Sequence, residues 1–273
     1  MSIRFCSKYA FVTIRVIDVN ERFFCIFISF DSLKLTEREK LKEKESEKMK
    51  KNGKKELLAG SLLIGAFVVW TILIQLVDVQ SIGVNGTKIG FATWNRWFHQ
   101  LTGANMDIFT ITDWLGLVPI FICMVFGVIG VTQLVKRGSL FKVDSDIIVL
   151  GIYYVIVIFS YLIFEMIPIN YRPILIEGRM EASYPSSTTL LVLCVMPTLV
   201  EQVNRRIKRE ALKKVIIVCA ICFSGFMVVG RLISGVHWFT DIVGAVMLSI
   251  GVFSIYKGFV LMCSKVKVKY SEK

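Results

Sequence analysis

Three residues near the C-terminal end of the chain have the types and spacing of a catalytic site. In "GRLISGVHWFTDIVG" (residues 230–244), Arg231, His237 and Asp241 follow the pattern R-x5-H-x3-D. If a helix begins at His237, Asp241 lies on the same face and can accept a hydrogen bond from one imidazole nitrogen. That bond would fix the tautomer and leave the other nitrogen as a nucleophile or base. A structural salt bridge is the alternative interpretation of this pair.

A second stretch, "INYRPILIEGRMEASYPSSTTLL", carries groups that bind anions. Arg172 is followed by proline, which restricts its backbone, and like Arg231 it offers a forked set of donors suited to phosphate oxygens. Ser186, Ser187 and Thr188 then open a predicted helix, whose N-terminus presents free N–H groups to an anion. An ordinary helix N-cap is the alternative for these hydroxyl residues.

The elements that must position these groups are predicted to be membrane-spanning helices. The chain of 273 residues is 55% hydrophobic with a mean hydropathy of +0.64, above the roughly 45–50% apolar content of a soluble domain. Several apolar runs approach or exceed the about 18 residues that mark a membrane span. We therefore expect an all-α polytopic membrane protein, a six-helix bundle. The expected helices are 57–79, 111–134, 146–167, 186–202, 213–233 and 240–263.

The formal charge of +12 does not indicate a nucleic-acid partner, because the Lys and Arg residues cluster between and beside the apolar runs. They are concentrated before the first expected helix, in the second-to-third and fourth-to-fifth connections, and after the sixth helix. The preference of basic loops for the cytoplasmic side predicts a multi-pass protein of the cell membrane with both termini cytoplasmic. The loops that carry Arg172 and His237 are then both external.

Residues 1–48 are predicted to be a poorly ordered, charged extension, and residues 49–273 the membrane domain. Met49 opens "MKKNGKKELLAGSLLIG", a basic start followed by the first expected helix. Lys44-Glu45, just upstream, can be encoded by a purine-rich stretch resembling a bacterial ribosome-binding site. We therefore hypothesise that Met49 is an alternative start. Peptides from residues 1–48 in natively expressed protein would contradict that hypothesis.

The seven cysteines predict neither disulfides nor a metal site. Five fall in or beside expected helices, two lie near the start, and none lies in a loop that we place outside. Cys219 and Cys222 form a C-x-x-C pair, but within "VIIVCAICFSG" they are best interpreted as small packing residues.

Taken together, the motifs resemble the three-part signature of the type 2 phosphatidic acid phosphatase family, K-x6-R-P, P-S-G-H and S-R-x5-H-x3-D. The resemblance covers about residues 57–263 and includes the placement of the motifs in the last two outer loops. The matching residues are Arg172-Pro173, Pro185-Ser186, Gly230-Arg231, His237 and Asp241.

The resemblance implies a phosphatase of the membrane surface that needs no metal or organic cofactor. His237 would attack phosphorus and form a phosphohistidine, and Asp241 would orient it. Arg172 and Arg231 would clamp the phosphate, with Ser186 as a further contact beside Ser187 and Thr188. The expected substrate is a lipid phosphate or diphosphate that enters sideways from the bilayer, so the partners are membrane lipids.

The sequence departs from the family pattern at four positions. Glu165, separated from Arg172 by six residues, replaces the lysine, Ser187 replaces glycine, and Gly230 replaces serine. Thr188 replaces the histidine that protonates the leaving group. The other histidine, His99, lies in the aromatic segment "FATWNRWFHQLTG", where an interfacial role is expected.

Loss of a general acid typically costs about 10² to 10⁴ in rate. The cost is smaller when the leaving group is itself a phosphate, so we expect lipid diphosphates to be preferred over monoesters. A catalytically impaired protein that binds, senses or scaffolds lipid phosphates is the alternative. The retained Arg172, Arg231, His237 and Asp241 favour the enzyme, because a binding site has less use for an oriented nucleophile.

Overall fold

The computed structural model describes residues 2–7, 10–15 and 24–263. Its contacts divide the chain into two units, residues 1–48 with 266–273, and residues 49–265. In the first unit, strands β1 (Ser2–Ser7) and β2 (Ala10–Arg15) pair antiparallel. These strands are an exception, among the described residues, to the expected all-α class. The division falls at Met49, but the hypothesis of a start there stays a prediction.

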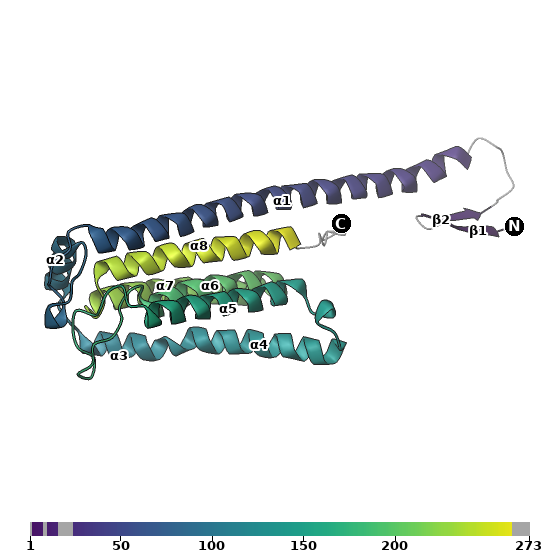
Figure 1. The fold of residues 1–273 in the computed structure, drawn as a ribbon. Coiled ribbons are helices and arrows are strands. Elements are labelled where there is room, and N and C mark those ends of the chain that lie inside the picture. The colour runs from purple at the N-terminus through teal and green to yellow at the C-terminus, as the bar shows by residue number, and fades with distance from the viewer. Residues whose placement is uncertain (1, 8–9, 16–23, 264–273) are drawn as a thin grey trace. The chain divides into compact units, whose positions relative to one another are not determined.

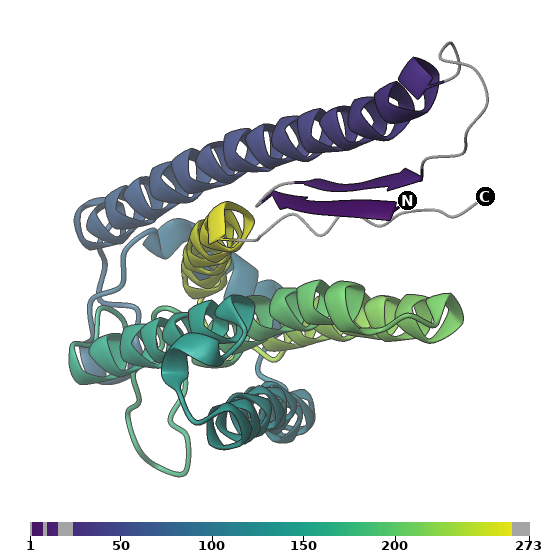
Figure 2. The same ribbon diagram turned by 90° about the vertical axis from the view of Figure 1, so that its right-hand side faces the viewer.

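The second unit is mainly helical (Figure 1), with isolated β-bridges in two of its connections. The long helix α1 (Phe24–Leu76) begins before this unit and ends within it. Short 3-10 turns η1 (Val84–Gly86) and η2 (Leu140–Lys142) lie in connections. The remaining helices are α2 (Ala92–Thr102), α3 (Met106–Leu115), α4 (Leu117–Arg137), α5 (Ser145–Met166), α6 (Ser187–Arg206), α7 (Glu210–Ile233) and α8 (Phe239–Cys263). Figure 2 shows that the bundle helices cross at angles, since α8 is seen nearly end-on while α7 is seen lengthwise.

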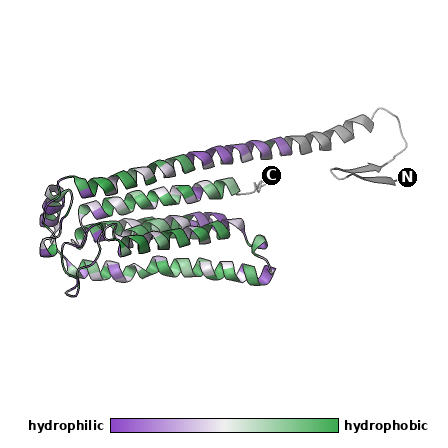
Figure 3. Cartoon of the chain, in the orientation of Figure 1, coloured by the Kyte–Doolittle hydropathy of each residue, from purple (hydrophilic) through white to green (hydrophobic). Residues whose placement is uncertain are grey.

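Figure 3 shows that α4, α5, α7 and α8 are apolar along most of their length, whereas α1 has a hydrophilic stretch before its apolar C-terminal part. Among the described residues, five segments are long and apolar enough to cross a membrane, and between 11% and 39% of the most apolar window of each is buried inside the protein. Most of their apolar side chains therefore face outward, where the lipid chains of a bilayer can solvate them. The five segments are 39–76, 106–137, 145–166, 210–233 and 239–263.

The expected helix 186–202 is present as α6, although it falls outside those five segments. Its C-terminal half carries charged residues, including Glu201 and Arg206. The helix lies between α7 and α8, and most of its N-terminal half is buried. Tyr153 on α5 donates a hydrogen bond to the backbone carbonyl of Cys194 at 3.0 Å. Neighbouring protein rather than lipid thus surrounds α6, which makes its polar residues tolerable.

Two expected helix boundaries were wrong. The first expected helix, 57–79, begins much earlier, because α1 also includes the charged segment before it. The second, 111–134, is two helices that meet at Gly116. A Cβ atom on Gly116 would lie 2.8 Å from the Asp113 carbonyl oxygen and 3.3 Å from Thr188 Cγ2. Glycine therefore allows the chain to turn here while the start of α6 packs against it.

The loop before α6 is anchored in the core by Tyr184. Its ring stacks on Phe67 of α1, with centroids 6.0 Å apart and planes 3° from parallel, and its hydroxyl shares a 2.7 Å hydrogen bond with Thr71. A Cβ atom on Gly244 would come within 2.5 Å of the Tyr184 ring, so glycine makes room for the ring on α8. This packing fixes the loop that carries the second motif beside the start of α8.

Candidate active site

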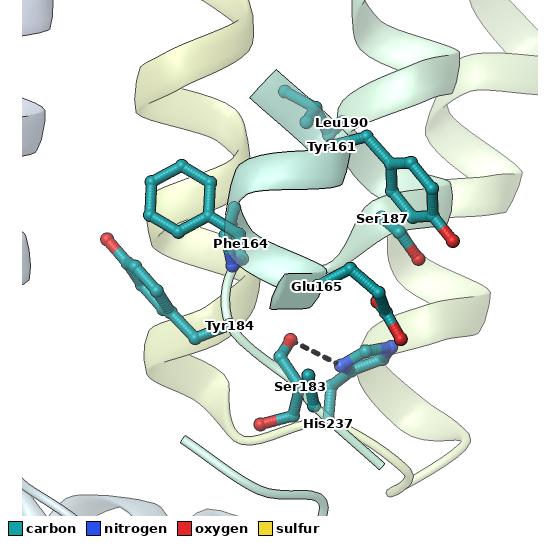
Figure 4. A pocket seen from close by; sticks show the side chains of 10 residues that line it. Tyr161, Phe164, Glu165, Ser183, Tyr184, Ser187, Leu190 and His237 are labelled. Carbon is teal, nitrogen blue, oxygen red and sulfur yellow. Dashed lines mark hydrogen bonds between the residues drawn. The ribbon is translucent and has the colours of Figure 1, made fainter. Parts of the chain in front are cut away.

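His237 sits in a tight turn between α7 and α8. Gly235 has a φ of 65°, and an added Cβ there would collide with the Gly103 carbonyl, so glycine is required on both counts. The His237 residue is 4% exposed. Its Nδ1 lies 3.0 Å from the Ser183 carbonyl oxygen (Figure 4). A carbonyl can only accept, so Nδ1 carries the proton and Nε2 keeps its lone pair.

Asp241 does not make the expected hydrogen bond to His237. The shortest distance between Asp241 Oδ2 and His237 Nδ1 is 3.8 Å, beyond hydrogen-bonding range. The carboxylate instead accepts from the Trp238 backbone N–H at 2.9 Å and from the Asn170 side chain at 3.2 Å. The predicted contact is wrong because the Ser183 carbonyl takes the imidazole proton, while Asp241 caps the first turn of α8.

The pKa of His237 lies well below its ordinary value of 6.5, first because the ring is buried and then because of the positive charges of Arg172 and Arg231. The hydrogen bond to Ser183 opposes this shift. His237 is therefore neutral at neutral pH, the state in which Nε2 can act as a nucleophile.

The two arginines from separate stretches of sequence converge beside the imidazole. Arg231 is 1% exposed, and its Nη2 lies 3.4 Å from His237 Nε2. Arg172, also buried, reaches the same place from the loop before α6. The guanidinium carbons of Arg231 and Arg172 lie 5.0 and 5.7 Å from the centre of the Phe109 ring, so both contact the same aromatic ring. The structure thus brings together three of the residues singled out by the motifs.

Both guanidinium groups keep donors that an anion could use. Arg231 Nη1 lies 3.6 Å from Asp113 and 3.4 Å from the Thr112 hydroxyl, and Arg172 Nε lies 3.1 Å from Glu181. Within the described part of the chain, Arg231 Nε and Arg172 Nη1 are buried without a hydrogen-bond partner. Buried N–H groups left unpaired cost about 1–3 kcal/mol each, and a phosphate oxygen would remove that cost.

The three hydroxyl residues that open α6 point in different directions. Ser186 is fully buried and donates a hydrogen bond to the Thr189 hydroxyl at 3.1 Å, so its hydroxyl is engaged inside the protein. Thr188 packs toward Gly116 and is not among the residues that line the pocket beside His237. Ser187 does line that pocket. Of the three, Ser187 is therefore placed to contact a ligand there.

The pocket lies between the C-terminal end of α5, the start of α6 and His237 (Figure 4). Its enclosed volume is small, about 10 Å³. Glu165 lines it together with Ser187 and His237, and Figure 4 shows its carboxylate facing the imidazole ring. A carboxyl group therefore occupies the wall where the family pattern has a lysine.

Helix α3 adds three residues that the motif pattern did not predict. Phe109 contacts both guanidinium groups, and Thr112 and Asp113 contact Arg231. A Cβ atom on Gly230 would lie 2.7 Å from Thr112 Cγ2. The close approach of α3 therefore explains why glycine stands where the family pattern has serine.

His99 lies outside the pocket. It is half-buried on α2, with its ring centroid 5.6 Å from that of Trp238 in an edge-on contact, and burial lowers its pKa. This aromatic contact ties α2 to the turn that carries His237. Among the described residues, no group of three or more His, Cys, Asp or Glu side chains could hold a metal ion.

Comparison with known proteins gives two matches. The model of the PAP2 superfamily matches residues 148–264, the part of the chain with all three motifs. A solved structure, titled as the first transmembrane PAP2-type phosphatidylglycerolphosphate phosphatase from Bacillus subtilis, aligns with a TM-score of 0.54 over 76% of this chain and 98% of that chain. At 16% identity this likeness establishes the fold alone. A search of curated proteins found no match.

Proposed function

We propose that this chain, whose residues 148–264 match the model of the PAP2 superfamily, is an integral-membrane phosphatase that hydrolyses a lipid phosphate or diphosphate. The observation that carries the proposal is the buried, neutral His237, whose Nε2 lies beside Arg231 and close to Arg172. A nucleophile between two fixed cations suits phosphoryl transfer, in which most of the catalysis is positioning and charge stabilisation.

In the proposed reaction, the phosphate binds between the two guanidinium groups and Ser187. His237 Nε2 attacks phosphorus, the bond to the leaving oxygen breaks, and a phosphohistidine forms. The Ser183 carbonyl holds the proton on Nδ1 and so keeps Nε2 available. Water then releases phosphate and restores the imidazole. The arginines stabilise the charge that spreads over the equatorial oxygens in both steps.

Binding without turnover is the second candidate. Two observations favour it: Thr188 stands where the family pattern has an acid, and each arginine lies within 4.0 Å of a carboxylate, Asp113 or Glu181. Both carboxylates would have to move away from the arginines before a phosphate could bind there. Both are partly exposed, with side-chain exposures of 60% and 38%, so solvent can receive them.

We further propose that the site faces the outside of the cell membrane and that both termini are cytoplasmic. The support is the set of basic residues at the other end of the bundle, including Lys136, Arg137, Arg205 and Arg206, because basic loops favour the cytoplasmic side. Labelling of intact cells with a membrane-impermeant thiol reagent tests this orientation in the variants Glu177→Cys and Lys136→Cys. We expect the reagent to label Glu177→Cys and not Lys136→Cys. Labelling of Lys136→Cys alone would mean that the orientation is the opposite one.

Phosphate release by purified protein tests the hydrolase. A panel of lipid monophosphates and diphosphates would be compared for the parent protein, His237→Ala and the control His99→Ala. We expect release by the parent and by the control, and none by His237→Ala. Tight binding of the lipids by the parent protein without release would favour the second candidate instead.

A further inference from the structure

We propose that Glu165 is the proton donor for the leaving group, in place of the histidine that Thr188 replaces. This inference rests on the proposed hydrolase function and concerns the same pocket. A poor leaving group, such as the alkoxide of a lipid phosphate monoester, needs a proton as its bond to phosphorus breaks. Without a donor, this chain would be restricted to leaving groups that depart as anions.

The placement of Glu165 fits that role. It lies in the last turn of α5 and lines the pocket opposite His237, with its carboxylate facing the imidazole (Figure 4). In phosphoryl transfer the attacking and leaving atoms lie roughly in line on opposite sides of phosphorus. A phosphate attacked by His237 Nε2 within this pocket would therefore direct its leaving oxygen away from the imidazole, toward the wall that Glu165 forms.

The other hydroxyl and acid groups of the pocket are less suitable. Tyr184 is 1% exposed and its hydroxyl is bonded to Thr71 at 2.7 Å. Tyr161 lies one turn before Glu165 on α5, and a phenol with an ordinary pKa near about 10 is a weak acid for this task. Thr188 packs toward Gly116 instead of lining the pocket. Glu165 is thus the carboxyl group that lines the pocket together with the nucleophile.

A substrate phosphate bound beside Glu165 brings a second acidic group next to the carboxyl, and a proton shared between the two removes their repulsion. Tyr161 lies within electrostatic range of Glu165, Arg172 and Glu181. A phosphate monoanion can also deliver the proton. The carboxyl group then donates its O–H toward the leaving oxygen, where a lysine would supply a permanent charge.

The proton is conserved through the cycle. As His237 Nε2 bonds to phosphorus, the ester P–O bond breaks, and its electron pair takes the proton of Glu165 to give an alcohol. Water then attacks the phosphohistidine, and the Glu165 carboxylate accepts a proton from that water as the P–N bond breaks. Phosphate leaves, and both the neutral imidazole and the protonated carboxyl are restored.

The test compares two leaving groups in the full-length protein. The substrates are an alkyl phosphate monoester lipid, whose alkoxide needs a proton, and nitrophenyl phosphate, whose phenolate does not. We expect Glu165→Gln to lower kcat/KM, which reports the formation of the phosphohistidine, by about 10² to 10⁴ for the alkyl ester and by less than about tenfold for the nitrophenyl ester. Glu165→Asp, which keeps a carboxyl group, should retain more alkyl-ester activity than Glu165→Gln. Glu177→Gln, in the loop that follows α5 and outside the pocket, is the matched control and should leave both rates unchanged.

Two results would overturn the role assigned to Glu165 and leave the proposed hydrolase function intact. One is an equal fall of kcat/KM for both esters in Glu165→Gln, which would indicate a structural role. The other is a rise for both esters, which would mean that the carboxylate only repels phosphate. Absence of phosphate release from either ester by the parent protein would instead overturn the proposed function, and this assignment with it.

Discussion

Charged residues lie at both ends of the membrane bundle, but their side chains differ in exposure and in pairing. Where α4 ends and α5 begins, Arg137 pairs with Asp144 at 2.8 Å, with side-chain exposures of 40% and 37%. At the same end, Arg206 lies 2.9 Å from Asp146. At the end that bears the site, the side chain of Arg231 is 1% exposed. One end has solvated ion pairs, and the other has a buried cation.

The difference in exposure indicates that the charged residues at the two ends have different roles. Exposed ion pairs contribute about 0–1 kcal/mol, so the first end gains little stability and serves as a set of basic anchors. A buried charge costs several kcal/mol unless its partners compensate for it. Partial pairing and unpartnered N–H groups at Arg231 are expected where a ligand completes the site, in line with the rule that ionisable residues within membrane helices serve a function.

The largest contrast should come from removing one arginine at each end. Arg231→Ala should lower kcat/KM for phosphate release by about 10² to 10³, because a fixed donor to the transferred phosphoryl group is lost. Arg206→Ala removes a solvated partner of Asp146 and should change kcat/KM by less than about threefold. Steady-state phosphate release measures both. A comparable loss of kcat/KM in the two variants would contradict the proposed difference between the two ends.

Aspartates at the two ends give a similar contrast in stability. Asp241→Ala leaves the Trp238 N–H and the Asn170 amide without their buried acceptor, and each should cost about 1–3 kcal/mol of unfolding free energy. Asp144→Ala removes partly exposed contacts with Arg137 and Arg206 and should cost about 0–1 kcal/mol. Denaturation in detergent measures both, and a larger loss in Asp144→Ala would contradict the comparison.

Replacing a phenylalanine at each end should give a smaller difference in kcat/KM. Phe109→Leu keeps an apolar side chain but removes the ring beneath both guanidinium groups. Cation–π contacts contribute about 0.5–2 kcal/mol, so kcat/KM should fall by about 2- to 30-fold. Phe141, which is 97% exposed at the other end, supplies the control Phe141→Leu with no expected effect. An unchanged kcat/KM in Phe109→Leu would mean that the ring does not hold the arginines in place.

The pH profile should show the smallest and most specific effect. Protonation of His237 removes the nucleophile, and its pKa lies below 6.5, so kcat/KM should stay level through pH 6.5 and fall only at lower pH. Arg172 is one cause of that low pKa, and Arg172→Gln should therefore move the acid limb to higher pH. The measurement compares the pH at which kcat/KM falls to half its maximum, and not the maximum itself, because the variant also binds phosphate less well. A parent limb at or above pH 6.5 would contradict a neutral, buried imidazole.

Much of the fold follows from the sequence, because apolar runs long enough to cross a bilayer have few other uses. The helix break at Gly116 was not predicted, since it depends on α6 packing against that point. Phe109 and Asp113 were not predicted either. They lie within an apolar run, and their contact with the arginines arises only when α3 packs on α7.

The chemistry of the site was predictable to the extent that side chains carry it. Motif spacing singled out Arg172, Arg231 and His237, and these residues do meet. The partner of the imidazole was missed because it is the Ser183 backbone carbonyl, and every residue has a carbonyl. Glu165 was visible as a departure from the family pattern, but its position opposite His237 required the packing of α5 beside the loop before α6.

Trapping the phosphorylated intermediate tests the central claim most directly. The parent protein would be mixed with labelled lipid phosphate, quenched during turnover under alkaline conditions that preserve phosphohistidine, and mapped by peptide mass. We predict a phosphoryl group on His237 that is lost on acid treatment and is absent from His237→Ala. Sustained phosphate release by His237→Ala, or a phosphoryl group on another residue during turnover, would contradict the account.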